Sequence, residues 1–310
     1  MNELIGILEN FKGKKILIIG DIMLDKYIFG KVERISPEAP VQVVEVKQEK
    51  YLPGGAANVA NNIAALNGNA TMVGIVGKDN ESGILVDELK KRGINTEGIF
   101  IDAERPTTQK VRILGQKQQL LRIDYEKRDY MGKELEDNIL KFIRKDISNT
   151  HAVIISDYAK GVITKSLAEE IKKIAKDKII IIDPKPRHKG FCKDVSLVTP
   201  NLKEAREMSF KEENLIKELN SPVLITKGEK GMSLYEKDGS VTNIPAKAKE
   251  VYDVSGAGDT VVATVALALS SNATLKQAAL LANHAAGITV GKVGTSTVSI
   301  EEIKRGLEDG

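Results

Sequence analysis

The sequence predicts an α/β fold: a doubly wound, mostly parallel sheet with a small inserted β lid. Short apolar runs alternate along the chain with segments of helical pattern, as in parallel strands that are buried between helices. Two stretches of alternating apolar and polar residues interrupt this series, and the chain after residue 256 is almost entirely helical in pattern. No internal repeat or low-complexity linker divides the 310 residues, so we expect a single domain over residues 1–310.

The composition is ordinary for a globular protein of the cytoplasm. The chain has 46 basic and 43 acidic side chains, and this balance gives no reason to expect a nucleic-acid or membrane partner. Cys192 is the only cysteine, which excludes a disulfide within the chain and fits a reducing compartment. The first residues lack the pattern of a signal peptide, and the longest apolar run, residues 261–269, is too short to span a bilayer. We therefore expect a cytoplasmic protein.

The apolar runs that predict parallel strands lead into polar or charged residues. The first run, residues 15–19, is followed by GDIMLD at residues 20–25, and further runs cover residues 71–76, 152–155, 178–182, 195–198 and 223–225. In an open α/β sheet, the residues beyond the carboxyl ends of the strands line the ligand crevice. We expect one cleft to be lined by Asp21, Asp25, Asp183, Lys185, Asn201, Glu204, Thr226, Lys227 and Gly228. An Asp after a strand is also a common turn former.

The predicted lid consists of two segments, residues 27–51 and about 98–124. The first alternates apolar and polar residues and contains two prolines, which indicates two short, half-exposed antiparallel strands. Within the second, residues 107–124 form a hairpin-like pattern around Gly115. Two β patches set into an alternating αβ chain indicate a separate small sheet, which would serve as a lid or as a dimerisation surface.

A run of small residues, GGAANVA at residues 54–60, starts a helix that reaches Leu66. Gly54 and Gly55 would let a ligand approach the backbone closely, and Asn58 could exchange hydrogen bonds with a polyol. The other interpretation is a helix of small residues that serves only close packing.

The stretch of residues 251–270, VYDVSGAGDTVVATVALALS, combines a small-residue turn with the start of an apolar helix. Such a turn presents unpaired N–H groups at the positive end of the helix dipole and favours an anion. Gly256, Ala257 and Gly258 keep bulky side chains away from that place. Asp259 would repel a resting anion, but it could take the proton of a hydroxyl that attacks a phosphate, which is worth roughly 10²–10⁴-fold in rate. An Asp in the first turn can also be a capping residue, and this stretch alone leaves both roles open.

Two common nucleotide-binding motifs are missing from the sequence. Gly20 is not followed by the further glycines of the dinucleotide loop, and no phosphate-binding G-x-x-x-x-G-K-[ST] string occurs. A nucleoside triphosphate would therefore be held by another device. The three histidines are scattered without the spacing of metal ligands, which argues against a zinc site.

Three motifs in order resemble the signatures of the ribokinase-like (PfkB) sugar kinases. They are GGAANVA at residues 54–60, followed by Gly74, Gly77 and Asp79; Asn201-x-x-Glu204; and DVSGAGDT at residues 253–260. The resemblance spans nearly the whole chain and implies ATP-dependent phosphorylation of a sugar hydroxyl. It implies Asp259 as the base and the backbone of residues 256–258 as the anion hole for the transferring phosphoryl group.

The same resemblance implies roles for the other cleft residues. Asp25, Gly55 and Asn58 would hold the sugar, with Asp21 and Gly54 close by. Asn201 and Glu204 would help to place Mg²⁺ and the phosphates, Glu204 through water. Thr226, Lys227, Gly228 and Asn283 would surround ATP. The lid of this family is often also its dimer interface, so we expect a homodimer.

Within the family, the chain is similar to the D-glycero-β-D-manno-heptose-7-phosphate kinases. The similarity rests on residues 20–46, 107–124 and 251–269. It implies transfer of the γ-phosphoryl group of ATP to the anomeric hydroxyl of a heptose 7-phosphate, a step toward nucleotide-heptose precursors of surface glycans. Lys110 and Arg112 alternate on one strand and so share a face, and with Lys185 they would contact the phosphate that the sugar already carries. A solvated lid face is the other interpretation of Lys110 and Arg112.

Two alternatives stay open at this point. One is a related kinase for another sugar or sugar phosphate, and the other is a phosphosugar sensor without catalytic activity. The intact Gly-Ala-Gly-Asp argues against the sensor, because a carboxylate beside bound phosphate does not help binding. Heptose kinases are often fused to a nucleotidyltransferase domain, and the sequence ends at Gly310. We therefore expect a separate protein to carry out nucleotidyl transfer.

Overall fold

A nine-stranded sheet forms the centre of the computed structural model, which describes residues 2–116, 118–247, 252–292 and 296–308. The strand order is β13-β12-β11-β10-β9-β8-β1-β4-β5, and every neighbouring pair from β11 to β5 is parallel. The strands are β1 (Lys15–Gly20), β4 (Asn69–Val76), β5 (Asn95–Ile101), β8 (Ala152–Ser156), β9 (Ile179–Asp183), β10 (Leu197–Val198), β11 (Val223–Thr226), β12 (Met232–Tyr235) and β13 (Val241–Ile244). The predicted mostly parallel sheet is confirmed.

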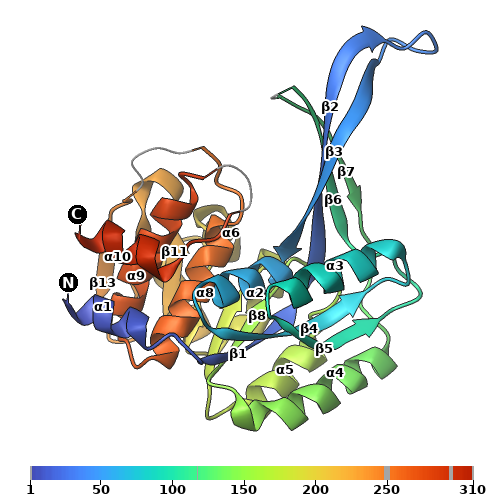
Figure 1. The fold of residues 1–310 in the computed structure, drawn as a ribbon. Helices are drawn as coiled ribbons and strands as arrows, with labels where there is room; N and C mark the ends of the chain where they lie inside the picture. The colour runs from blue at the N-terminus through green and yellow to red at the C-terminus, as the bar shows by residue number, and fades with distance from the viewer. Residues whose placement is uncertain (1, 117, 248–251, 293–295, 309–310) are drawn as a thin grey trace.

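Helices cover both faces of this sheet (Figure 1). One layer contains α1 (Asn2–Glu9), α2 (Ala56–Ala65), α3 (Asn80–Lys91), α8 (Ala257–Ser270), α9 (Leu275–Thr289) and α10 (Ile300–Glu308). The other contains α4 (Lys133–Asp146), α5 (Lys165–Ile174), α6 (Leu202–Met208) and α7 (Glu212–Leu219). Short 3₁₀ helices lie at Ile147–Asn149, Pro186–Cys192 and Gly228–Lys230. None of the described helices is long and apolar enough to cross a membrane.

Strand β1 is apolar from Ile16 to Ile19 because helices cover both of its faces. Ile16 and Ile18 pack into the first helix layer, whereas Leu17 and Ile19 pack into the second. Successive side chains of a strand point to opposite faces, so a strand that is covered on both sides has no polar position to offer.

A second sheet of four strands, here called the small sheet, projects away from the main one (Figure 1). Its order is β3-β2-β6-β7, formed by β2 (Ile22–Ile35), β3 (Gln42–Gly55), β6 (Gln109–Gly115) and β7 (Gln118–Tyr125). The predicted inserted sheet and the hairpin pattern around Gly115 are confirmed. The strands of the first segment are longer than expected, since β2 and β3 have 14 residues each.

Two predicted boundaries are corrected by the structure. The second lid segment, about 98–124, begins too early, because residues 95–101 form β5, which pairs with β4 in the main sheet. The side chains of Ile99 and Phe100 pack against the two core clusters, one on each side of the sheet. The strand expected at residues 195–198 covers only Leu197–Val198. The antiparallel strands β12 and β13 were not predicted from the sequence.

The two faces of the small sheet differ in chemistry. Residues that are paired directly across neighbouring strands share a face, so Ile28, Ile113 and Leu121 lie on one side. Asp25 and Lys110 lie on the opposite side, in register with Asp124 of β7. The first face, here called the apolar face, carries these side chains beside a Lys26–Glu49 ion pair, and the other face carries the charged groups around Asp25.

Candidate functional site

Helix α8 begins at the carboxyl edge of the main sheet with the small residues that the sequence analysis identified. Gly256 has the left-handed backbone φ of 80° and forms the N-cap. In the described part of the chain, the N–H groups of Gly258 and Asp259 have no hydrogen-bond acceptor. A Cβ atom added to Gly258 would meet nothing within 4 Å. The first turn of α8 thus offers free N–H donors beside open space, an arrangement that suits an anion.

The carboxylate of Asp259 is buried and held by two side chains from other elements. Asn58 Nδ2 donates to Oδ2 at 2.7 Å, and the Tyr158 hydroxyl donates to Oδ1 at 2.7 Å. Both oxygens thus accept from side chains, which argues against a capping role. Burial raises the pKa of Asp259 to about 6, while the bonds from Tyr158 and Asn58 oppose that rise. A carboxyl with this pKa is mostly ionised at neutral pH and can accept a proton.

Helix α2 packs closely, as one interpretation of its small residues predicted, and the expected contact of Asn58 with a polyol stays a prediction. Ala56, Ala57 and Ala60 are fully buried against the core, so the helix packs closely. The same packing brings α2 against α8, where Asn62 Oδ1 accepts from the Thr260 hydroxyl at 2.9 Å. Asn62 Nδ2 in turn donates to the carbonyl of Asn58 at 2.9 Å. These bonds fix Asn58 beside Asp259.

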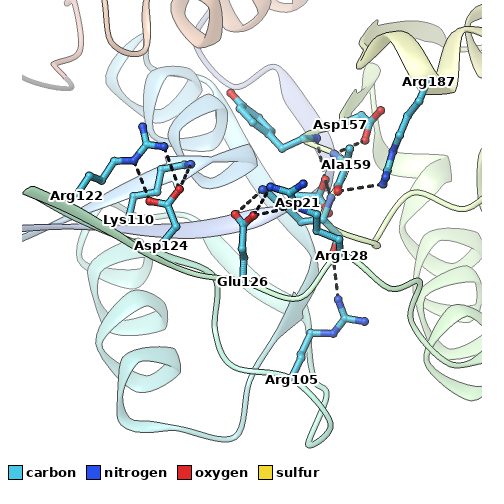
Figure 2. A network of polar contacts seen from close by, with 12 residues as sticks. Asp21, Arg105, Lys110, Arg122, Asp124, Glu126, Arg128, Asp157, Ala159 and Arg187 are labelled. Atoms are coloured by element: carbon cyan, nitrogen blue, oxygen red, sulfur yellow. Dashed lines mark hydrogen bonds and ion pairs between the residues drawn. The ribbon is translucent and has the colours of Figure 1, made fainter.

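Asp21, at the end of β1, binds backbone rather than side chains. Its carboxylate accepts from the N–H groups of Tyr158 at 2.7 Å, Lys160 at 3.1 Å and Val162 at 3.1 Å. Figure 2 shows Asp21 at the centre of this network, with Asp157 and Ala159 beside it. Asp21 therefore holds the turn that follows β8, and its expected proximity to the sugar stays a prediction.

Asp25, on the charged face of the small sheet, is paired with Arg112. Arg112 Nη1 donates to Asp25 Oδ1, and its guanidinium lies over the Tyr27 ring, 5.2 Å from the centroid. Gly54 is directly beside this carboxylate, because a Cβ atom there would lie 2.5 Å from Asp25 Oδ2. Asp25, Gly54 and Arg112 thus lie close together, but the guanidinium of Arg112 is already paired with the Asp25 carboxylate.

Lys110 lies on the same face as Arg112, as the alternation predicted. Its ammonium shares the carboxylate of Asp124 with Arg122, at 3.7 Å from Lys110 Nζ and 2.9 Å from Arg122 Nε (Figure 2). Two cations face one carboxylate, so this part of the sheet keeps a net positive charge. Arg122 was missed in the sequence because a charged residue on a half-exposed strand is an ordinary feature.

Lys185, which follows β9, forms an ion pair with Glu204 of α6. Asn201 and Glu204 also form a capping box at the start of α6: Glu204 N donates to Asn201 Oδ1 at 2.9 Å, and Asn201 N donates to Glu204 Oε2 at 3.0 Å. Asp183 ends β9 nearby, and burial raises its pKa to about 8, with Lys185 opposing the rise. Asp183, Lys185 and Glu204 thus lie close to one another, and Asp183 lies close enough to Asp259 for the two carboxyl groups to interact.

The residues expected around ATP lie on the β11 side of the sheet. Thr226 ends β11 and forms a parallel bridge with Asn201. Lys227 Nζ is 2.6 Å from Glu212 Oε2, and Gly228 has a φ of 57°. Asn283 of α9 is buried and donates through Nδ2 to the carbonyl of Pro245 at 2.8 Å. No bond between this group and Asp259 is present in the described residues, and its expected nucleotide contacts stay predictions.

A magnesium ion fits this donor set only together with phosphate groups. Among the described residues, no three His, Cys, Asp or Glu side chains converge as a metal cage. Mg²⁺ in nucleotide sites keeps several waters and binds one or two carboxylates plus phosphate oxygens. Glu204 is such a carboxylate, and its oxygens would have to exchange Lys185 and the Asn201 N–H for water or metal.

A family model for pfkB family carbohydrate kinases matches residues 13–303. The chain belongs to this family. Among solved structures, this pfkB chain resembles Arabidopsis thaliana ribokinase complexed with ribose and ATP, with a TM-score of 0.73 and 18% identity over 96% of the chain and 99% of that structure. Escherichia coli phosphofructokinase-2 in complex with substrates and products gives a TM-score of 0.73 at 17% identity, over 94% and 97%. The ribokinase-like fold is confirmed.

Curated relatives of this pfkB protein are more similar in sequence. Bifunctional protein HldE of Desulfatibacillum aliphaticivorans is 42% identical over 96% of the chain and 64% of its own length. HldE of Helicobacter pylori (strain J99) is 44% identical over 94% of the chain and 65% of its own length. The chain thus spans less than two thirds of the length of these relatives.

We expect Gly54→Ala to raise the KM for the carbohydrate substrate by about tenfold while the enzyme stays folded. The added methyl group would displace the Asp25 carboxylate, which Arg112 prevents from turning away freely, and small misplacements in a site are costly. Steady-state kinetics and the thermal unfolding midpoint would test this. Gly83→Ala is the matched control, because its Cβ atom in α3 would meet nothing within 4 Å. An unchanged KM in Gly54→Ala would contradict the expectation.

Proposed function

We propose that this chain transfers the γ-phosphoryl group of ATP to the anomeric hydroxyl of D-glycero-D-manno-heptose 7-phosphate, giving the 1,7-bisphosphate. The observation that carries the proposal is the buried Asp259 carboxylate in the first turn of α8, next to free N–H donors. A binding site for phosphate alone would gain nothing from that charge. A base beside an anion site is what phosphoryl transfer to a hydroxyl requires.

In the proposed mechanism, the carboxylate of Asp259 takes the proton of the anomeric hydroxyl as its oxygen attacks the γ-phosphorus. The bond between that phosphorus and the β–γ bridging oxygen breaks, and ADP leaves. The N–H groups of Gly258 and Asp259 stabilise the charge on the phosphoryl oxygens, since they are fixed in place before the reaction. Glu204 would hold Mg²⁺ through water, and the ion would neutralise phosphate charge when bound.

A substrate that already carries a phosphate fits the charges of the small sheet. Lys110 and Arg122 share Asp124 and retain a net positive charge on the face that also carries Asp25. Arg112 and Lys185 are each occupied by a carboxylate, so they would contact the phosphate only after exchanging that partner. We therefore propose that Lys110 and Arg122 make the main contacts with the phosphate that the sugar substrate already carries.

The choice of heptose among sugar phosphates rests on sequence resemblance. Residues 20–46 and 107–124, which resemble heptose-7-phosphate kinases, form most of the small sheet, and the third such stretch, 251–269, contains most of α8. The HldE relatives match the chain over more than nine tenths of its length. The alternative is another ribokinase-like sugar or sugar-phosphate kinase.

We expect rapid turnover of ATP with heptose 7-phosphate and a loss of at least about 100-fold in kcat for Asp259→Asn. The amide cannot take the proton, but it preserves the shape of the site, so sugar binding should persist in calorimetry. A panel of ribose, fructose 6-phosphate and heptose 7-phosphate would identify the acceptor. Turnover only with another sugar would overturn the heptose assignment, and near-normal turnover in Asp259→Asn would overturn the base.

We expect kcat to fall on acidification, with a limb at or somewhat above pH 6. Burial raises the pKa of Asp259 to about 6, and bound phosphates would raise it further because they disfavour a second negative charge. The base is ionised above this pH and protonated below it, so kcat should fall about tenfold per pH unit on the acid side. Saturating substrates exclude the titration of free sugar phosphate. A constant kcat down to pH 4.5 would contradict the assignment.

We further propose that two copies of the chain associate through the apolar face of the small sheet. Val46 and Leu121 are 52% and 53% exposed, and Leu121 lies on the same face as Ile28 and Ile113. An apolar face of this kind is unfavourable in water when left uncovered. In the proposed two-fold dimer, the same face of a second copy covers this surface.

We expect the double variant Val46→Asp, Leu121→Asp to be a monomer under conditions in which the wild type is a dimer. Each copy would place two buried, unpaired carboxylates at the symmetric interface, which is strongly unfavourable. Light scattering coupled to size exclusion would measure the mass. Gln48→Asp is the control, because Gln48 pairs with Phe29 on the other face. A wild type that is monomeric at high concentration would refute the interface.

A further inference from the structure

Tyr158 contacts the proposed base but has no role in the mechanism described so far. It follows β8 directly, in the turn that Asp21 holds through three backbone N–H groups. Arg105 binds the same turn, since its Nη1 donates to the carbonyl of Lys160 at 3.0 Å. The turn that carries Tyr158 is thus held by two side chains.

The side chain of Tyr158 is fixed as well. Lys185 Nζ lies 5.0 Å from the centroid of its ring, a distance at which the cation is attracted to the ring face. Its hydroxyl donates to Asp259 Oδ1 at 2.7 Å. Burial, followed by the Asp259 charge, raises the pKa of Tyr158 well above its usual value. The hydroxyl therefore keeps its proton and serves as a donor.

A carboxylate oxygen has two lone pairs, and the structure occupies one on each oxygen of Asp259. Asn58 alone would leave the group able to turn about its Cβ–Cγ bond, but two donors on different oxygens prevent that rotation. The remaining lone pairs then point in fixed directions. A fixed base is worth much in rate, since a misplacement of about 1 Å can cost on the order of 100-fold.

We propose that Tyr158 is a positioning residue for phosphoryl transfer: with Asn58, it clamps the carboxylate of Asp259 so that a free lone pair faces the acceptor hydroxyl. This inference rests on the proposed role of Asp259 as the base. Tyr158 acts through Asp259 and need not touch either substrate, so its loss should lower kcat rather than binding.

The clamp also affects the titration of Asp259. A donor to the ionised form favours that form, so the Tyr158 hydroxyl lowers the pKa of Asp259. The charged groups around Asp259 act in both directions: Asp25 opposes its ionisation, whereas Lys185 favours it. Burial raises the pKa of the nearby Asp183 to about 8, so Asp183 is mostly protonated at the pH of the acid limb. Removing the hydroxyl alone should therefore raise the pKa of the base and leave these charges in place.

The test is Tyr158→Phe, which removes only the hydroxyl. We expect kcat to fall about tenfold or more, both KM values to stay within about threefold, and the acid limb of kcat to move upward by about half to one pH unit. Tyr130→Phe is the matched control, because the Tyr130 hydroxyl bonds with His188 Nε2 at 2.9 Å in a different contact. It should leave the limb unmoved. Tyr158→Met, which also lacks the donor but adapts to irregular space, replaces the Phe variant if that variant fails to fold.

The outcomes separate this inference from the function on which it rests. A lower kcat with an unmoved acid limb, or with a limb that moves equally in Tyr130→Phe, would reduce Tyr158 to a packing role and overturn the proposal. Unchanged kcat and limb in an active enzyme that Asp259→Asn inactivates would overturn it too and leave the kinase intact. Full activity in Asp259→Asn would instead contradict both the role of Asp259 as the base and the role of Tyr158, which depends on it.

Discussion

The site depends on one interaction, the burial of the Asp259 carboxylate between donors from two distant segments. An ionised group loses favourable hydration when it is buried, and it stays charged only if hydrogen bonds replace the lost water. Asn58 from α2 and Tyr158 from the turn after β8 provide those bonds. This requirement explains why α2 packs so closely against α8 and why the turn after β8 is held so firmly.

A second carboxylate, that of Asp21, holds the backbone of the turn after β8 in place. Three N–H groups of one turn converge on it, so the turn is built around a side chain from the neighbouring strand β1. Asp157 holds the segment that follows β9: its carboxylate bonds with His188 Nδ1 at 2.7 Å and accepts from the Lys185 N–H at 3.1 Å. Carboxylates at the strand ends therefore form a scaffold as well as a site.

The sequence predicted those parts of the molecule that depend on local pattern. Apolar runs located the parallel strands other than β5, and the small-residue turn located Asp259 and its free N–H donors. Contacts between distant segments could not be predicted in this way. Tyr158 is 101 residues from Asp259, and nothing in the string SDY distinguishes a clamp from a loop aromatic. The partners of Arg112 and Lys185 likewise exist only once the chain has folded. Strands β12 (MSLY) and β13 (VTNI) were missed because each is short and mixes polar with apolar residues, whereas β11, of the same length, is an apolar run.

The connections of the small sheet have a mechanical consequence. Strand β1 ends at Gly20 and β2 begins at Ile22, while β3 ends at Gly55 and α2 begins at Ala56. With a single residue on one side and none on the other, this sheet has no flexible tether there and can tilt only by bending at those junctions. A tilt would move Gly54 and Asp25 together and would pull on the first turn of α2, which carries Asn58. The position of the acceptor sugar and the orientation of the Asp259 carboxylate are therefore coupled through the continuous backbone.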